Sequence, residues 1–189
     1  MTMETVISIF LGIGLAASVG FRVFLPLFAL SLAAYFDVWQ LNDSWQWIGS
    51  QSALIVLGVA TIVEIFGYYI PLIDNALDTI AIPLATVAGT AVMVSTVADL
   101  SPVVTWALAI IAGGGTAVAI KSSASVTRLS STVSTAGFGN PIVSTVETGT
   151  SVVMSVLAIF VPIIAFLFVL LIFYVLYRLF KKVRRKPKA

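Results

Sequence analysis

Residues 152–177 read VVMSVLAIFVPIIAFLFVLLIFYVLY and contain no charged side chain. A helix needs about 20 apolar residues to cross the hydrocarbon core of a bilayer, and about 17 is the lower limit. This stretch exceeds that length. Five earlier apolar runs cover residues 4–19, 23–36, 52–70, 79–98 and 103–120. The last three of these also reach the limit, and the first is marginal. The sequence therefore predicts an all-α fold, a polytopic transmembrane helical bundle.

The overall composition agrees with a membrane protein. Of the 189 residues, 60% are hydrophobic and 10% are charged, whereas about 25% of residues are charged in a typical soluble domain. Residues 1–4 contain no lysine or arginine, so the first run does not have the basic leader of a cleaved signal peptide. We expect a single transmembrane domain over residues 1–178 and a basic cytoplasmic tail over residues 179–189.

The residue types argue against enzymatic chemistry. The sequence has no cysteine and no histidine, which excludes disulfides, thiolate chemistry and zinc, haem or iron–sulfur sites built on those residues. It has neither a phosphate-binding glycine loop nor a nucleophilic serine elbow. We expect no enzyme activity, no cofactor and no metal centre. A bound metal would have to be a hard cation held by oxygen.

The distribution of basic residues predicts the orientation. Seven of the ten lie in residues 178–188, RLFKKVRRKPK. A basic cluster directly after a hydrophobic span marks the cytoplasmic side, so the C-terminus is predicted inside. Because each crossing changes the side of the membrane, the positions of the other turns follow. The predicted cytoplasmic positions are Lys121, Asp74, Asp78 and Arg22. The predicted outside positions are residues 99–102, residues 37–47 and Met1.

Residues 121–139, KSSASVTRLSSTVSTAGFG, have to cross or deeply enter the membrane in this scheme, because Lys121 is inside and the last helix starts outside near Asn140. The prediction is about seven membrane segments, including short or re-entrant helices, with the N-terminus out and the C-terminus in. An even number of segments, with residues 121–139 as a surface loop, is the alternative.

The last helix is expected to be unusually long. Asn140 is a favourable N-cap, and Pro141 suits the first helical turn. A helix from there to Arg178, kinked at Pro162, would measure roughly 55–60 Å at 1.5 Å per residue, far more than a bilayer. Its hydroxyl-rich first part must be bent, re-entrant or buried in protein. We interpret residues 121–151 as the lining of an internal polar cavity.

Glu64, Asp74 and Asp78 are the first acidic candidates for function. Glu64 lies in an apolar run, where an ionised side chain costs about 2.5–3.5 kcal/mol near the bilayer centre. It is either a proton- or cation-binding carboxylate or the structural ion-pair partner of Arg22 or Arg128. Asp74 and Asp78 are four residues apart and share one helix face. They either complement the start of a helix or form the mouth of a cation site.

The remaining charged candidates are Arg22, Arg128 and Glu147. Arg22 follows a glycine at a helix break, where it either extends to the cytoplasmic interface or binds an anionic head group or phosphate. Arg128 has the same two alternatives, and its hydroxyl-bearing neighbours favour the functional one. Glu147 and Glu64 would bind protons or cations, while the two arginines would bind an anion or act as counter-charges.

The triple glycine Gly113, Gly114 and Gly115 lies in an apolar run, where each glycine costs a helix about 1 kcal/mol. Close packing of helices through small residues explains it, and so does a locally unwound segment that exposes carbonyls, as in transporters. Packing is the preferred explanation. The stretch LATVAGTAV at residues 84–92 is echoed by LAIIAGGGTAV at residues 108–118, which indicates a duplicated small-residue seam.

Four blocks carry a family resemblance: GFRVFLPLFALSLAA, IPLIDNALDTIAIPLATVAGT, DLSPVVTWALAIIAGGG and GFGNPIVSTVE. With them, residues 17–147 resemble an uncharacterised bacterial integral membrane family of the domain of unknown function 4126 type. The resemblance implies an integral membrane protein and no established activity. A weaker likeness is to DedA-type lipid-phosphate carriers, in which an acid precedes a proline-containing re-entrant stretch, here Glu64 and Pro71, and an arginine lies near another, here Arg22 and Pro26.

These observations predict a small multi-pass transporter or channel-like protein of the bacterial cytoplasmic (inner) membrane that moves a small ion or polar solute. Its cavity would contain the charged candidates, Asn140 and the triple glycine. The first alternative is a protein that binds or translocates an anionic lipid or lipid phosphate. The second is a structural assembly partner without transport activity. Expected partners are the lipid bilayer, anionic lipid head groups and a second copy in a homodimer, but no nucleic acid.

Overall fold

The structure is a computed structural model that describes residues 2–98 and 100–184. The described chain is all-α, as predicted. Its elements in order are α1 (Met3–Phe21), α2 (Phe24–Tyr35), the 3₁₀ helix η1 (Asp43–Gly49), α3 (Gln51–Gly67), α4 (Pro71–Thr96), α5 (Pro102–Leu108), the π-helix η2 (Ala109–Gly114), α6 (Gly115–Thr135), α7 (Asn140–Phe160) and α8 (Pro162–Arg184).

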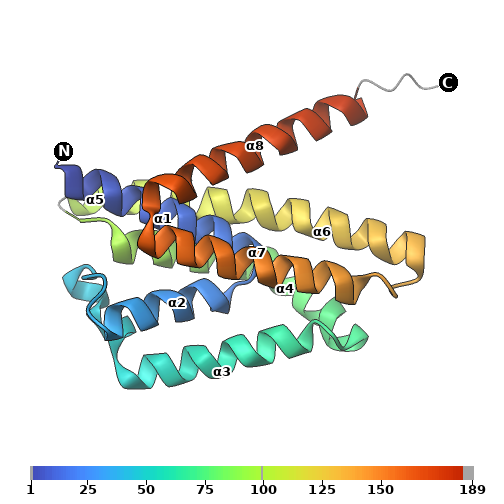
Figure 1. Ribbon diagram of the computed structural model, residues 1–189, viewed down its shortest axis with the longest axis horizontal. Helices are drawn as coiled ribbons and strands as arrows, with labels where there is room; N and C mark the ends of the chain where they lie inside the picture. Colours follow the sequence, from blue (N-terminus) through green and yellow to red (C-terminus); the bar gives the residue numbers. More distant parts are fainter. Residues whose placement is uncertain (1, 99, 185–189) are drawn as a thin grey trace.

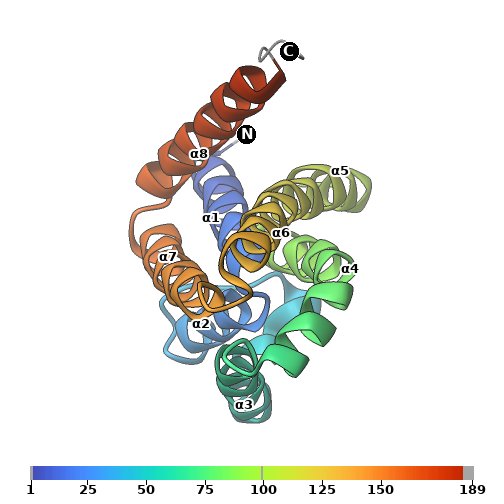
Figure 2. The same ribbon diagram turned by 90° about the vertical axis from the view of Figure 1, so that its right-hand side faces the viewer.

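Helix α1 is the centre of the bundle. Figure 2 looks along the helices and shows α4, α6, α7 and α8 around it. Leu11, Leu15 and Val19 of α1 are fully buried and belong to the main hydrophobic core. That core also takes Leu30 from α2 and Val92 from α4. The apolar face of α1 therefore holds the other helices together.

The helices have the length and apolarity of membrane spans. Within the described residues, five stretches could cross a bilayer: Met3–Phe21, Ala76–Thr96, Pro102–Thr135, Asn140–Phe160 and Pro162–Leu179. The number rises to six if η1 and α3, which are bent by 63°, form one broken span. Helix α2 is apolar but has only 12 residues. An apolar bundle of this kind indicates a membrane-embedded protein.

The turns gather at two ends of the bundle (Figure 1). The N-terminal end contains the starts of α1 and α5, the α2–η1 loop and the α7–α8 junction. The opposite end, which we call the α6–α7 end, contains the α3–α4 and α6–α7 turns, and α8 extends in the same direction. Met1, Asp99 and residues 185–189, which include the predicted extracellular terminus and the last part of the basic tail, lie outside the described residues.

Residues 121–139 do not form a separate crossing, so that part of the prediction was wrong, and the alternative of a surface loop was wrong as well. Residues 121–135 continue the helical run that starts at Pro102. The chain reverses at residues 136–139, where Ala136 (φ 53°) and Gly137 (φ 90°) adopt left-handed conformations. Asn140 consequently lies at the α6–α7 end, on the same side as Asp74, instead of on the opposite side as predicted.

The single long helix predicted from Asn140 to Arg178 is two helices. Pro162 starts α8, and Val161 before it has a non-helical conformation (φ −142°, ψ 67°). Helix α8 turns back toward the α6–α7 end (Figure 1) and extends to Arg184, so the predicted tail is helical at its beginning. The indole Nε1 of Trp39 donates to the carbonyl of Ile159 at 2.8 Å, which satisfies an acceptor next to the break.

The small-residue seam is a helix crossing. Gly89 in α4 and Gly113 in η2 lie against each other, and a Cβ on Gly113 would come within 2.5 Å of the Gly89 carbonyl oxygen. A Cβ on Gly114 would be 2.8 Å from Thr90 Oγ1, whereas Gly115 has nothing within 4 Å. The two echoing sequence stretches thus face each other. Close packing accounts for Gly113 and Gly114, and the backbone stays helical there as a π-helix.

Candidate functional site

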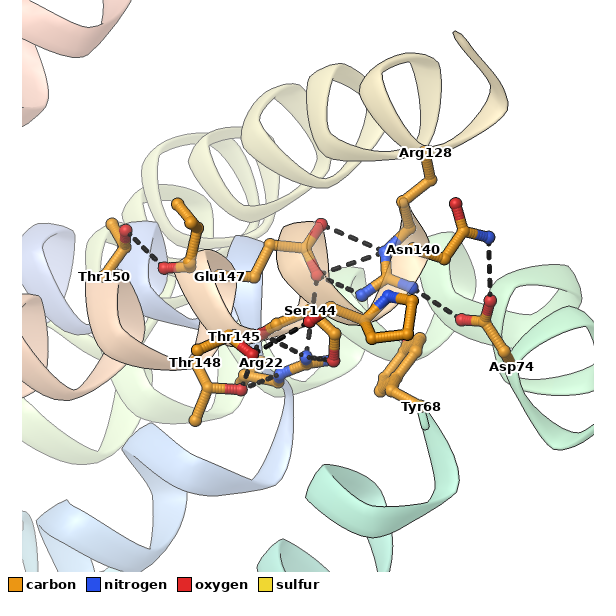
Figure 3. Close-up of polar contacts among 12 residues, drawn as sticks. Arg22, Tyr68, Asp74, Arg128, Asn140, Ser144, Thr145, Glu147, Thr148 and Thr150 are labelled. Atoms are coloured by element: carbon orange, nitrogen blue, oxygen red, sulfur yellow. Dashed lines mark hydrogen bonds and ion pairs between the residues drawn. The ribbon is translucent and has the colours of Figure 1, made fainter. Parts of the chain in front are cut away.

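The three basic residues that precede the cluster at residues 178–188 meet inside the bundle. The side chains of Arg22, Lys121 and Arg128 are at most 2% exposed. They come from the end of α1 and from two positions on α6. The buried carboxylates of Asp74, Glu64 and Glu147 lie among them. Figure 3 shows the two arginines with Asp74 and Glu147. We call this set, together with Tyr68 and Asp78, the charged cluster.

Arg128 joins two carboxylates from different helices. Its Nε donates to both oxygens of Glu147 in α7, at 3.0 and 3.1 Å, and its Nη2 also bonds Glu147 Oε2. Its Nη1 donates to Asp74 Oδ1 in α4 at 2.5 Å. The other oxygen of Asp74 accepts from Asn140 Nδ2 at 3.2 Å. Arg128 therefore connects α4, α6 and α7 through charge-assisted hydrogen bonds.

Arg22 approaches Glu147 from the other side. Its Nη2 lies 3.7 Å from Glu147 Oε2 and donates to the carbonyl and hydroxyl oxygens of Ser144, at 2.8 and 2.5 Å. Its Nε donates to Thr148 Oγ1 at 2.9 Å. Its Nη1 is buried and has no hydrogen-bond partner among the described residues. One carboxylate, Glu147, thus faces two fully buried guanidinium groups.

Tyr68 lies where the three cations converge. The guanidinium carbons of Arg22 and Arg128 are 4.1 and 4.3 Å from the centre of its ring, within the range of cation–π attraction. Lys121 Nζ donates to the phenol oxygen at 3.2 Å. Burial, and after it the negative charge of Asp78, raises the pKa of the Tyr68 phenol. The ring therefore stays neutral and supplies a π face between the cations.

Glu64 has a role that the sequence interpretation did not consider. Its two carboxylate oxygens accept from the backbone N–H groups of Val23 and Phe24, at 2.7 and 2.9 Å. The break between α1 and α2 leaves these amides without a helical partner, and the N-cap residue of α2, Val23, has no side-chain acceptor of its own. No ion pair joins Glu64 to Arg22 or Arg128 in the part of the chain that the structure describes. The predicted pair was wrong, and Glu64 caps the start of α2.

Asp74 and Asp78 differ in their surroundings. Asp74 is tied to Arg128 and Asn140, so it does more than complement the helix start. Asp78 Oδ1 is buried without a hydrogen-bond partner among the described residues. With all groups ionised, the cluster holds four acids (Glu64, Asp74, Asp78 and Glu147) against three bases, a formal charge of −1. One proton or one monovalent cation would neutralise it.

A polar stripe on α7 continues from the cluster toward the N-terminal end. Its members face the interior at helical spacing: Asn140, Ser144, Glu147, Ser151 and Ser155. Ser18 of α1 donates to or accepts from Ser151 Oγ and Ser155 Oγ at 2.8 and 2.7 Å. Beyond Ser155, Gly14 packs against Ala158 and Ala165 so closely that a Cβ would lie 2.9 and 3.0 Å from their methyl groups. The stripe thus ends at an apolar contact between Gly14, Ala158 and Ala165, which we call the seal.

Two cavities reach the cluster from different directions. The mouth cavity, about 370 Å³, opens at the α6–α7 end and is lined by Tyr68, Asp74 and Asn140 among others. The lateral groove, about 320 Å³, lies between α6, α7 and α8 and touches Glu147 and Thr127. Arg128 lies between them, because it binds Asp74 on one side and Glu147 on the other.

The structure brings together most of the candidate residues, with some changes of role. Asn140 is the first residue of α7, but its side chain bonds Asp74 and Thr132 and does not cap the helix. The triple glycine lies outside the cluster, at the α4–η2 crossing. The sequence interpretation missed Tyr68, Ser144 and the serines near Ser18, and it was wrong to place Lys121 in a cytoplasmic turn, because Lys121 is buried within α6. No group of three or more potential metal-ligating side chains occurs among the residues that were placed.

Comparison with known families gives one match. The family model described as "Domain of unknown function (DUF4126)" matches residues 9–182. Neither a curated protein nor a solved structure matches the chain. The match covers all the helices of the bundle except the beginning of α1 and the last residues of α8.

Proposed function

Because the chain belongs to the DUF4126 family, whose description assigns no activity, we propose a function from the site itself: a small membrane carrier that moves an ion or small polar solute through the charged cluster. The observation that carries the proposal is the position of Arg128. It bridges a carboxylate in the mouth cavity, Asp74, and a carboxylate at the lateral groove and the α7 stripe, Glu147. If Arg128 released either Asp74 or Glu147, the mouth cavity would connect with the polar stripe on α7.

The orientation follows from charge. In this proposal we count seven consecutive segments: α1, α2, α3, α4, the run α5–α6, α7 and α8. Their odd number agrees with the start of α1 and the end of α8 lying toward opposite ends of the bundle (Figure 1). Arg178, Lys181 and Lys182 in α8 favour the cytoplasmic side. The mouth cavity would therefore open to the cytoplasm of a bacterial inner membrane, and the N-terminal end would face outward.

The energetics favour a working site over a purely structural one. Ionisable groups inside a membrane bundle are costly, and they usually mark ion or substrate pathways. Replacing a buried ion pair with well-packed apolar residues is often neutral or stabilising, so stability alone is a weak reason to retain four acids and three bases. The hydroxyl stripe supplies further polar surface beyond the cluster, up to the seal at Gly14 and Ala158. In this conformation the seal would close the outer side.

The experiment is a flux assay in proteoliposomes with H⁺, Na⁺, K⁺ and Cl⁻ as probes. Glu147→Gln removes the charge between the two arginines, and Glu4→Gln, an exposed site on α1, is the matched control. We expect flux of at least one probe in the parent and in Glu4→Gln, and at least a tenfold loss in Glu147→Gln. The double variant Arg128→Gln/Glu147→Gln removes one charge of each sign, and we expect it to fold and to lack flux.

Two results would count against a carrier. One is a parent protein that moves none of the four ions above the rate of empty vesicles. The other is a double variant that is folded, as judged by its thermal unfolding in detergent, and retains the parent's flux. Either result would favour the structural assembly role, in which the charges only hold helices together.

A further inference from the structure

Asp78 is the acid of the charged cluster whose contacts are incomplete. Both carboxylate oxygens of Glu64, Asp74 and Glu147 accept hydrogen bonds. Asp78 Oδ1, in contrast, is buried and has no hydrogen-bond partner within the described chain. The ion pairs between described residues use Asp74 and Glu147 and not Asp78. A negative charge on a buried oxygen without a donor is costly.

Asp78 lies on the interior face of α4. It follows Asp74 by one helical turn, and the next residues on that face, Ala81 and Ala85, are buried. The residue as a whole is partly exposed, so it can exchange a proton with its surroundings. The titratable groups around it come from α4, α6, α7 and the turn before α4: Asp74, Lys121, Arg128, Glu147 and Tyr68.

One proton would balance the charge of the cluster. Its four acids outnumber its three bases by one when every group is ionised. A metal cation would need several oxygen ligands, and it would lie among the positive charges of Arg22, Lys121 and Arg128. A proton needs a single lone pair. Because donors occupy the oxygens of the other three acids, the unoccupied Oδ1 of Asp78 is the favoured position for it.

We propose that Asp78 holds one proton in this conformation and that this proton controls the contact between Arg128 and Asp74. Arg128 Nη1 donates to Asp74 Oδ1 at 2.5 Å (Figure 3), and Asp78 is four residues further along the same face, about 6 Å along the helix. Once Asp78 has released its proton to water, it competes with Asp74 for Arg128. The proton would thus be the ion that is coupled to transport, a role that rests on the proposed function, whereas the proton site itself does not.

The test is infrared spectroscopy of the full-length protein in vesicles of palmitoyl-oleoyl phosphatidylglycerol while the pH is raised. Exposed aspartates lose their proton at about pH 4, so a carboxylic acid band that persists above about pH 6 belongs to a shielded group. We expect this band in the parent, reversible loss of it at higher pH, and no such band in Asp78→Asn. Asp43→Asn, at an exposed acid in η1, is the matched control and should keep the band.

Isotope labelling of the parent identifies the residue type without a substitution. Carbon-13 in the aspartate carboxyls should shift the band, whereas carbon-13 in the glutamate carboxyls should not. This measurement decides the matter if Asp78→Asn does not fold. The proton site is overturned if the parent has no such band, if a folded Asp78→Asn variant keeps it, or if labelled glutamate shifts it.

The control of Arg128 is tested by the coupling between Arg128 and Asp74. The unfolding temperatures of the parent, Arg128→Gln, Asp74→Asn and the double variant give this coupling. It should fall over the pH range in which the band disappears, and it should stay constant in the Asp78→Asn background. A coupling that does not change with pH overturns the control.

The flux assay separates this inference from the proposed function. A parent that has the aspartate band but moves none of the four probe ions keeps the proton site and contradicts the carrier. A parent that moves an ion without the band keeps the carrier and overturns the present inference.

Discussion

Arg128 and Glu147 join α6 to α7 by a buried ion pair: the Arg128 Nε donates to both Glu147 oxygens, at 3.0 and 3.1 Å, inside an apolar bundle. Neither residue lies at a surface where water could solvate its charge. Each needs the other, because an uncompensated charge at this depth is far more costly than a neutral pair.

Removing one member of this pair should destabilise the protein more than removing both. Glu147→Gln leaves Arg22 and Arg128 without their shared carboxylate, and we expect a loss of about 3–5 kcal/mol. Arg128→Gln/Glu147→Gln should recover a substantial part of that loss. Thermal unfolding in detergent of the parent, both single variants and the double variant gives the coupling. Equal and additive losses would show that the two side chains do not depend on each other.

The loss of stability caused by a substitution of Glu64 should depend on the hydrogen bonds that are lost and not on the lost charge. Glu64→Gln keeps one carbonyl oxygen for an amide of Val23 or Phe24, whereas Glu64→Leu leaves both donors buried and unpaired. Each such orphan costs about 1–3 kcal/mol. We therefore expect Leu to lower the unfolding temperature clearly more than Gln does. If the two variants were equally damaging, the role of Glu64 would be its charge and not the capping of α2.

The triple glycine provides a matched pair of substitutions. Gly113→Ala would place a methyl group 2.5 Å from the Gly89 carbonyl oxygen, and we expect overpacking to destabilise the protein by about 1–3 kcal/mol. Gly115→Ala points into open space and should be neutral, or stabilising by up to about 1 kcal/mol because alanine favours helix. Measuring the unfolding temperatures of the two variants tests the packing at the α4–η2 crossing. A Gly115→Ala variant less stable than Gly113→Ala would contradict it.

The corrected positions of the turns can be tested with single cysteines, because the natural chain has none. Ser44→Cys lies at the N-terminal end and Phe138→Cys in the α6–α7 turn, and both positions are exposed. In inner-membrane vesicles with the cytoplasmic side outward, a membrane-impermeant maleimide should label position 138 and not position 44. Intact spheroplasts should give the opposite result. Labelling of both positions from the same side would refute the arrangement of α6 and α7.

Much of the fold was predictable because hydropathy decides it. Apolar runs long enough to span a bilayer appear directly in the sequence, and Pro141 correctly indicated where α7 begins. The break at Val161 could not be predicted, because a proline such as Pro162 either kinks or ends a helix and the sequence does not decide which. Here the contact of Ala165 with Gly14 and the Trp39 bond to Ile159 accompany the reversal, and these join residues over 100 positions apart.

The cluster was partly visible for a similar reason. Charged residues that interrupt apolar helices need buried partners, so Arg22, Arg128 and Glu147 stood out. Tyr68 did not stand out, because a tyrosine at the end of an apolar helix is typical of an interface anchor. Only the structure shows that three cations surround it. The partners of Glu64 are backbone amides, and amides carry no signal in the amino-acid sequence.

The most direct test of a polar pathway does not need a known substrate. Ser151→Cys places a thiol in the α7 stripe, at a fully buried position between the cluster and the seal, and Leu30→Cys is a buried control in the apolar core. In the membrane, a small charged thiosulfonate should modify position 151 slowly from the cytoplasmic side while position 30 stays unreactive. If both positions resist modification in the membrane but react after unfolding in detergent, the interior is closed to water and the carrier proposal is wrong.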